Sequence, residues 1–168
     1  MNRTATTLAR TRFVRTVRRS TALLALACAL PAAWADSREM PASAMLPVYK
    51  QECAACHMAY PPGMLPASSW SRMMTRLDQH YGTDASLDAA MVRQIGTWLE
   101  AHAGTYKRVR EAPHQDRITQ SAWFERKHRD VEPAVWKRAA VGSPANCMAC
   151  HTRADQGDFD DDRVRIPK

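Results

Sequence analysis

The sequence predicts a mostly α-helical protein built from two successive units, and three observations support this prediction. Apolar residues recur at the i, i+3, i+4, i+7 spacing of an amphipathic helix over residues 70–81 and again over residues 87–102. No segment shows the strict alternation of apolar and polar residues that marks a half-buried strand. The pattern Cys-x-x-Cys-His occurs at residues 53–57 and again at residues 147–151.

The first 35 residues have the pattern of a secretory signal peptide. Residues 1–20 contain six arginines and no acidic residue, residues 21–32 are almost wholly apolar, and Ala33-Trp34-Ala35 offers small residues at a cleavage site. The apolar run is too short for a membrane span, which needs about 20 residues. We therefore expect residues 1–35 to be removed, leaving a periplasmic protein that has no membrane span.

Removal of this segment also removes most of the excess positive charge. Six of the 24 basic residues leave with it, so 18 basic side chains remain beside 17 acidic ones. A nearly neutral chain gives no case for nucleic acid binding. Cys28 is removed with the signal peptide as well. The alternative is that Cys28 is the lipid-modified cysteine of a lipoprotein, but Ala25-Leu26-Ala27 before it is a poor lipobox.

The repeated motif indicates two covalently attached c-type haems. Two thiols three residues apart on one turn can each bond a vinyl arm of the porphyrin, and the next residue then lies under the iron. Its imidazole becomes the fifth iron ligand. The residues concerned are Cys53, Cys56 and His57 in the first motif and Cys147, Cys150 and His151 in the second.

Three other interpretations of the cysteines compete with haem. Zinc ribbons space their cysteine pairs by roughly 15 to 20 residues, whereas about 90 residues separate Cys56 from Cys147. A thioredoxin-like dithiol needs a βαβ unit, and the sequence shows no such alternation. Structural disulfides remain an alternative in an exported chain.

The first haem unit is expected over residues 36–104. Its helices are expected at residues 44–56, 70–81 and 87–102. Pro61-Pro62-Gly63 forces a turn after the first helix, Gly82 ends the second, and Ser86 is placed to cap the third. Apart from the sixth iron ligand, this is the layout of a small class I cytochrome c.

The second unit, residues 118–168, follows a polar connector at residues 105–117 and shows weaker signals. Short helices are expected at residues 119–130 and 133–140, and mostly coil after the second motif. The unit ends in an acidic tail, Asp158 to Asp162, which is either a docking surface for a partner or a solvated segment. An irregular, short-helix second haem unit is therefore predicted.

The sixth iron ligand decides the chemistry of each haem. Methionine raises the potential, a second histidine lowers it, and an open position lets a gas or peroxide bind. For the first haem we predict His80, which lies on the apolar side of the predicted helix 70–81. Its rivals are Met64, a loop ligand by position, and Met73 and Met74, which look more like core residues. His102 is interpreted as a packing or surface residue.

For the second haem we predict His128. It follows Trp123 and Phe124, two aromatic residues that could wall a porphyrin. The competing His114 lies in the polar connector beside Pro113, where solvation is the simpler interpretation.

These segments resemble the dihaem cytochrome c family of proteobacteria over about residues 47–167. The resemblance is carried by four stretches, namely residues 52–66, Leu77-Asp78-Gln79-His80-Tyr81-Gly82, Trp123 to His128, and Gly157-Asp158-Phe159 to Ile166-Pro167. It implies two haems with paired histidine ligands, and His80 and His128 fall where the family motifs carry histidine. It also implies electron delivery from a membrane cytochrome b to a small oxygen-binding monohaem cytochrome, the sphaeroides haem protein.

We therefore predict a periplasmic one-electron carrier that is not an enzyme, because six-coordinate irons leave no open site for a substrate. One alternative is a haem enzyme like the dihaem cytochrome c peroxidases, which are roughly twice this length. The other is a gas-binding sensor. Both alternatives need an open or releasable iron position.

Overall fold

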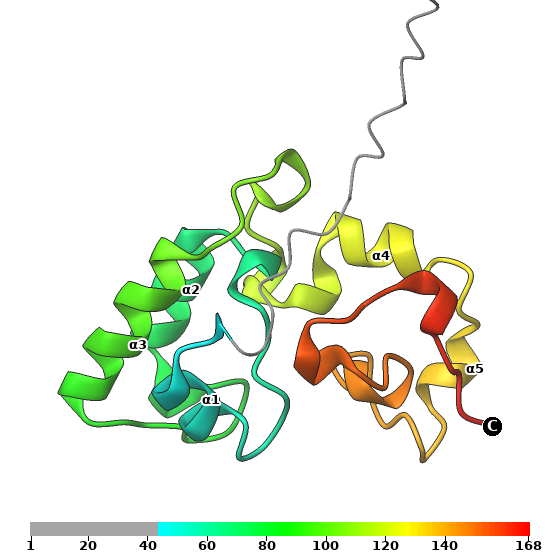
Figure 1. The fold of residues 1–168 in the computed structure, drawn as a ribbon, viewed down its shortest axis with the longest axis horizontal. Coiled ribbons are helices and arrows are strands. Elements are labelled where there is room, and N and C mark those ends of the chain that lie inside the picture. Colours follow the sequence, from blue (N-terminus) through cyan, green and yellow to red (C-terminus); the bar gives the residue numbers. More distant parts are fainter. Residues whose placement is uncertain (1–43) are drawn as a thin grey trace, which may run out of the picture. The chain divides into compact units, whose positions relative to one another are not determined.

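Helices and tight turns make up the described part of the chain (Figure 1). The computed structural model describes residues 44–168, so the predicted signal peptide and Cys28 lie outside the described residues. Residues 44–168 contain five α-helices, eight short 3-10 turns and no strand. The mostly α-helical class is therefore confirmed. None of the helices within these residues is both long and apolar enough to cross a membrane.

The first half of the described chain is built on three helices, α1 (Pro47–Cys53), α2 (Ala67–Met74) and α3 (Ala89–Ala101). Helix α3 packs against both α1 and α2 (Figure 1). The apolar faces of the three helices and the loop after α1 form the main core, which consists of Met45, Tyr49, Ala59, Leu65, Trp70, Met74, Ile95 and Leu99. The Trp70 indole also donates to the Pro62 carbonyl at 2.8 Å, which ties α2 to that loop.

The helix predicted over residues 70–81 is interrupted in the structure. Helix α2 starts three residues earlier and ends at Met74. The Thr75 hydroxyl donates to the Arg72 carbonyl at 2.9 Å, a local bond of the kind that competes with helix continuation. A 3-10 turn, Leu77–Gln79, follows and ends at His80. His80 therefore projects from a turn and not from the face of a long helix.

Helix α3 begins at a different cap from the one expected. The Asp88 carboxylate accepts from the backbone N–H of Ala90 at 2.8 Å and of Met91 at 2.9 Å. A carboxylate satisfies these unpaired amides and also suits the positive end of the helix dipole. Asp88, and not Ser86, therefore sets the start of the helix.

The second half contains two short helices, α4 (Ala122–His128) and α5 (Pro133–Trp136). Both are shorter than predicted. Ser121 caps α4 by accepting from the Phe124 N–H at 3.3 Å, and Pro133 occupies the first turn of α5. The rest of this half consists of loops and 3-10 turns, at Cys147–Ala149, Ala154–Gln156 and Asp161–Arg163.

Polar contacts from Tyr60, Arg72 and Tyr81 link the first half to the connector and to the second half. The Tyr60 hydroxyl donates to the Ala145 carbonyl at 2.7 Å, and Arg72 pairs with Asp116 of the connector at 2.6 Å. Both halves lie in one compact unit, residues 35–168. The division into two haem units, with boundaries at residues 104 and 118, stays a prediction.

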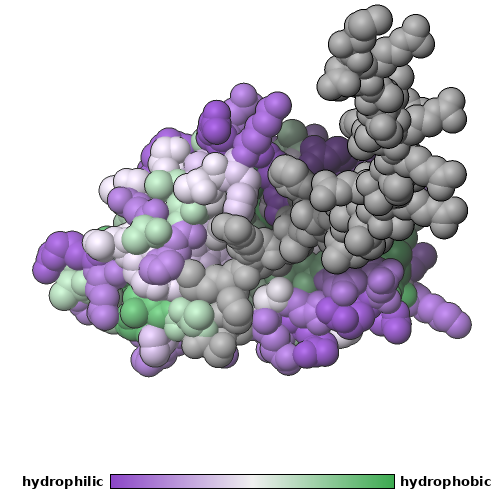
Figure 2. All heavy atoms as spheres, turned by 45° about the horizontal axis from the view of Figure 1, so that its top comes forward, coloured by the Kyte–Doolittle hydropathy of each residue, from purple (hydrophilic) through white to green (hydrophobic). Residues whose placement is uncertain are grey.

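The face shown in Figure 2 is mainly hydrophilic, with hydrophobic residues showing in small areas. Among the described residues, the large hydrophobic side chains with high exposure are Tyr81, at 42 %, and Ile166, at 48 %. Scattered exposure of this kind is normal for a globular protein.

Gly104 provides a test of the packing between α3 and the loop after α1. Its N–H donates to the Leu65 carbonyl at 2.8 Å. A Cβ at this position would clash with the Gly63 carbonyl oxygen and lie 2.7 Å from Val109 Cγ1. We predict that Gly104→Ala lowers the free energy of unfolding of the holoprotein by about 1–3 kcal/mol, the usual cost of overpacking.

Gly96→Ala is the matched control, because a Cβ there meets only Met74 Cγ at an ordinary 3.6 Å. It should be neutral or stabilising, since glycine costs up to about 1 kcal/mol within a helix. Denaturant unfolding of both variants gives the comparison. Equal stabilities would contradict the close approach at Gly104.

Candidate functional site

The first site is a pair of facing histidines. The rings of His57 and His80 have their centres 6.1 Å apart and their planes 27° apart. With metal to imidazole nitrogen bonds of about 2 Å on each side, ring centres come to lie roughly 6 Å apart. The pair therefore has the separation that one iron atom between the two rings would require.

The second site has the same separation and a different orientation. The ring centres of His128 and His151 are 6.2 Å apart, and the ring planes are 78° apart. His128 is the last residue of α4, and its ring stacks on Phe124 with centres 4.0 Å apart. His151 follows the turn Cys147–Ala149. Again two imidazoles from segments distant in sequence face each other at the spacing that one iron needs.

Hydrogen bonds fix which ring nitrogen can bind a metal. His57 Nδ1 lies 2.7 Å from the Met58 carbonyl oxygen, and His128 Nδ1 lies 2.9 Å from the Phe124 carbonyl oxygen. A carbonyl oxygen only accepts, so Nδ1 must carry the proton in both rings. Nε2 is then the nitrogen with a lone pair for a metal, the arrangement that a second hydrogen bond usually enforces on a ligating histidine.

The other histidine of each pair is kept neutral by its surroundings. Burial, and next the neighbouring His57, lower the pKa of His80. Burial, and next His128, lower the pKa of His151. Neutral imidazole is the form that coordinates a metal, so both pairs are suited to ligation at neutral pH.

The cysteines lie beside these histidines and form no disulfide with one another. Cys53 ends α1, where burial, and next the Glu52 carboxylate, raise the pKa of its thiol to about 11. Burial also raises the pKa of the Cys150 thiol. Within residues 44–168, no three or more His, Cys, Asp or Glu side chains gather into a metal cluster, so the zinc alternative finds no support.

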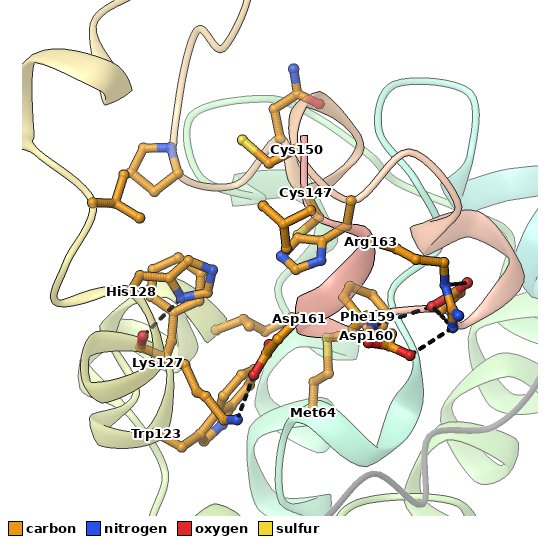
Figure 3. A pocket seen from close by; sticks show the side chains of 18 of the residues that line it. Met64, Trp123, Lys127, His128, Cys147, Cys150, Phe159, Asp160, Asp161 and Arg163 are labelled. Atoms are coloured by element: carbon orange, nitrogen blue, oxygen red, sulfur yellow. Dashed lines mark hydrogen bonds and ion pairs between the residues drawn. The ribbon is translucent and has the colours of Figure 1, made fainter. Parts of the chain in front are cut away.

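A cavity of about 820 Å³ adjoins the second pair of histidines (Figure 3). This lies within the range of pockets that hold cofactor-sized ligands. Its walls include the cysteines and histidines of the second site together with apolar and aromatic side chains, among them Met64, Ile118, Trp123, Phe124, Val131, Trp136 and Phe159. The cavity also carries charged side chains, among them Arg108, Lys127 and Asp158. A cavity with an apolar and aromatic wall, thiols and paired imidazoles fits a covalently attached haem.

Apart from Met64, the rival ligands lie away from the two sites. His102 is exposed and its Nδ1 bonds to the Trp98 carbonyl at 2.7 Å, and His114 is exposed with its Nδ1 2.9 Å from Gln120 Oε1. Met74 is buried in the main core and Met73 packs against it. Met64 is also buried, but it lines the cavity of the second site. The structure thus brings the four predicted histidines together in two pairs, and of these rivals Met64 alone lies at a site, in the wall of the second cavity.

Tyr60 is a site residue that the sequence did not reveal. Its ring stacks on His57, with centres 4.9 Å apart, while its hydroxyl bonds to Ala145, two residues before Cys147. Burial, then Cys147 and Tyr81, raise its pKa to about 12. Tyr60 therefore links the ligand of the first site to the loop that leads into the second motif. The only sequence signal for a role of Tyr60 is its position between the first haem motif and the Pro61-Pro62 turn.

The acidic tail is largely neutralised by its own neighbours. Asp158 pairs with Arg163 at 2.8 Å, and only 14 % of its side chain is exposed. Asp160 pairs with the same arginine at 3.0 Å, and Asp161 pairs with Lys127 of α4 at 3.2 Å. These pairs hold the tail beside the second cavity. Most of the tail's negative charge is therefore balanced by neighbouring arginine and lysine side chains, which argues against the interpretation of the tail as a docking surface.

The comparisons with known proteins agree with this geometry. A dihaem cytochrome c family model matches residues 49–159. The structure resembles a dihaem cytochrome c from Shewanella baltica with a TM-score of 0.65 and 36 % identity, covering 76 % of this chain and 95 % of that one. It resembles a dihaem cytochrome c from Rhodobacter sphaeroides with a TM-score of 0.62 and 42 % identity, covering 69 % of this chain and 98 % of that one. No curated protein matches the sequence.

The family match spans most of the described residues, and both solved structures are covered almost completely. The motifs at residues 53–57 and 147–151 supply the two attachment sites that such a protein needs. This chain therefore belongs to the dihaem cytochrome c family, carries two covalently bound haem c groups, and has the role of a haem-based electron carrier.

Proposed function

We propose that this protein is a periplasmic one-electron carrier in which histidines occupy both axial positions of both irons. His57 and His80 hold the first iron, and His128 and His151 hold the second. The observation that carries the proposal is the separation of the ring centres, 6.1 Å in one pair and 6.2 Å in the other. Each haem supplies a one-electron couple between ferrous and ferric iron.

The protein contributes position and electrostatics to this couple. Backbone carbonyls orient His57 and His128, and apolar and aromatic side chains form part of the wall of the second cavity. Ligation by two imidazoles gives a six-coordinate, low-spin iron and a lower potential than ligation by one histidine and one methionine. With both axial positions filled there is no place for peroxide, oxygen or nitric oxide, which argues against a peroxidase-like enzyme and against a gas sensor.

The localisation and partners are proposed from the sequence. Residues 1–35 have the pattern of an export signal, which favours the periplasm. The resemblance to the family favours a membrane cytochrome b as electron donor and a small oxygen-binding monohaem cytochrome as acceptor. Both partners suit a carrier that docks briefly and releases quickly.

Replacing a proposed sixth ligand should open one iron at a time. We predict that His80→Ala and His128→Ala each convert one haem to a high-spin form that binds carbon monoxide, because alanine leaves one axial position of that iron without its imidazole ligand. The matched controls, His102→Ala and His114→Ala, should remain fully low-spin. Optical spectra with and without carbon monoxide measure this. Carbon monoxide binding by the parent protein, or by the His114→Ala variant alone, would contradict the assignment.

The two haems should differ in electron paramagnetic resonance. Nearly parallel imidazole planes separate the two iron d-orbitals that interact with the ligand π systems, whereas nearly perpendicular planes leave them close in energy. With planes 27° apart in one pair and 78° apart in the other, we predict a rhombic low-spin signal from the first haem. The second should give a more anisotropic signal with a larger maximum g value.

Loss of one signal in each ligand variant assigns the two haems. His80→Ala should remove the rhombic signal, and His128→Ala the anisotropic one. Two identical low-spin signals in the parent protein would show that the ring orientations differ from those described.

The proposed acceptor can be tested by rapid mixing. Fully reduced protein should transfer one electron rapidly to the oxidised monohaem oxygen-binding cytochrome from the same organism, in stopped-flow experiments followed optically. A monohaem cytochrome c of similar size and charge from an unrelated pathway is the control. Equal rates for the two acceptors would remove support for the proposed partner while leaving the carrier function intact.

A further inference from the structure

Among the buried side-chain nitrogen and oxygen atoms of residues 44–168, the indole Nε1 of Trp123 has no hydrogen-bond partner. Burying an N–H without a partner is costly, and such orphans are few in native proteins. The indole nitrogen is a donor only. Its missing partner is therefore a hydrogen-bond acceptor located next to the indole nitrogen.

Trp123 lines the cavity of the second site (Figure 3). In that view it lies with Lys127 on one side of the cavity, and Cys147 and Cys150 lie on the opposite side. The cysteines bond the vinyl edge of a haem, and the propionate arms leave the porphyrin from the edge opposite the vinyl groups. The indole of Trp123 is therefore on the side where carboxylates are expected.

The spacing along α4 agrees with this placement. His128 and Trp123 lie five residues apart, which corresponds to about 7.5 Å along a helix. That distance is comparable with the reach from the centre of a porphyrin to the ends of its propionate arms. Side chains five residues apart point about 140° apart around a helix axis, so it is the shared cavity lining, and not the helical face, that puts Trp123 and His128 at one site.

The charges nearby suit a carboxylate as well. Lys127 follows Trp123 by one turn, and so lies on the same side of the helix, and Arg108 also lines the cavity. Lys127 already pairs with Asp161, but that pair is exposed, with 46 % and 75 % of the two side chains accessible, and exposed pairs are weak. Three of the four aspartates in the cavity wall are in ion pairs, Asp158 and Asp160 with Arg163 and Asp161 with Lys127.

We propose that the indole N–H of Trp123 donates a hydrogen bond to a propionate carboxylate of the second haem, and that this bond helps to set the potential of that haem. The bond withdraws negative charge from the neighbourhood of the iron. Without it, the carboxylate favours ferric over ferrous iron more strongly. Trp123 is therefore a tuning and positioning residue. The inference rests on the proposed placement of the second haem between His128 and His151.

The test compares two replacements that separate the donor from the ring. Trp123→Phe keeps an aromatic ring and loses the N–H, whereas Trp123→Gln loses the ring and keeps an N–H donor. In redox titrations of the holoprotein, Trp123→Phe should lower the potential of the second haem and leave that of the first unchanged. The expected fall changes the ferric to ferrous ratio several-fold at a given potential, where tenfold corresponds to about 59 mV. Trp123→Gln should give a smaller fall.

Trp136→Phe is the matched control, because Trp136 lines the same cavity and its nitrogen is not an orphan. It should not reproduce the fall. Nuclear magnetic resonance gives an independent measurement: the Trp123 indole proton, identified by its loss in Trp123→Phe, should exchange slowly with solvent and change shift when the second iron is reduced. A rapidly exchanging indole proton, an unchanged potential in Trp123→Phe, or equal falls in Trp123→Phe and Trp136→Phe would overturn the proposal.

Haem content and spin state separate this inference from the placement on which it rests. Each variant should retain two haems and a fully low-spin spectrum. If the spectrum of the parent protein instead showed that His128 does not bind the second iron, the placement of that haem would fail first, and the hydrogen bond with it. If Trp123→Phe kept two haems and a low-spin spectrum and left the potential of the second haem unchanged, the proposed hydrogen bond alone would be wrong.

Discussion

The structure depends on one constraint: two imidazole rings must face each other at the separation that a single iron atom spans, and cysteine thiols must lie beside one of them. Each half of the protein meets this constraint once, with ring centres 6.1 Å and 6.2 Å apart. The means differ. In the first half, three helices around a common core hold the loops that carry the histidines. In the second, one short helix and a series of tight turns do so, and the arrangement must draw much of its order from the covalently attached haem.

That difference follows from the amount of apolar surface each half can bury. The main core gathers eight buried residues from α1, α2, α3 and the loop after α1. The second half buries few large side chains, chiefly Phe124, Val135 and Val141. A chain segment this short gains little from its own side chains, so a large apolar cofactor is a substantial part of its core. Contacts from the first half add to it, since Met64 lines the second cavity and Tyr60 reaches Ala145. The two halves are thus linked by residues adjacent to the haem sites themselves.

The sequence predicted the fold class because helical periodicity and haem motifs are local signals. The sequence also favoured His80 and His128 because of their apolar and aromatic neighbours, and their rings lie 6.1 Å and 6.2 Å from those of His57 and His151. Their binding to iron stays a prediction. His102 also follows apolar residues, so this signal alone does not separate the histidines. The boundaries of the elements were less predictable. Thr75 interrupts the expected helix by bonding to Arg72, and Asp88 replaces Ser86 as a cap. Both outcomes are decided by competing side-chain to backbone bonds, and periodicity carries no information about them. Tyr60 could not be assigned, because its role arises only when the two halves meet. Met64 was considered as a ligand of the first haem and lines the second cavity instead, whereas Trp123 lines that cavity, as expected of a wall residue.

The central claim is that histidine is the sixth ligand at both irons. A crystal structure of the mature holoprotein tests it most directly, because it shows the atoms bound to each iron. The account predicts Nε2 of His57 and His80 on the two faces of the first haem, and Nε2 of His151 and His128 on the two faces of the second. A methionine sulfur, a water molecule or an open position on either iron would contradict it.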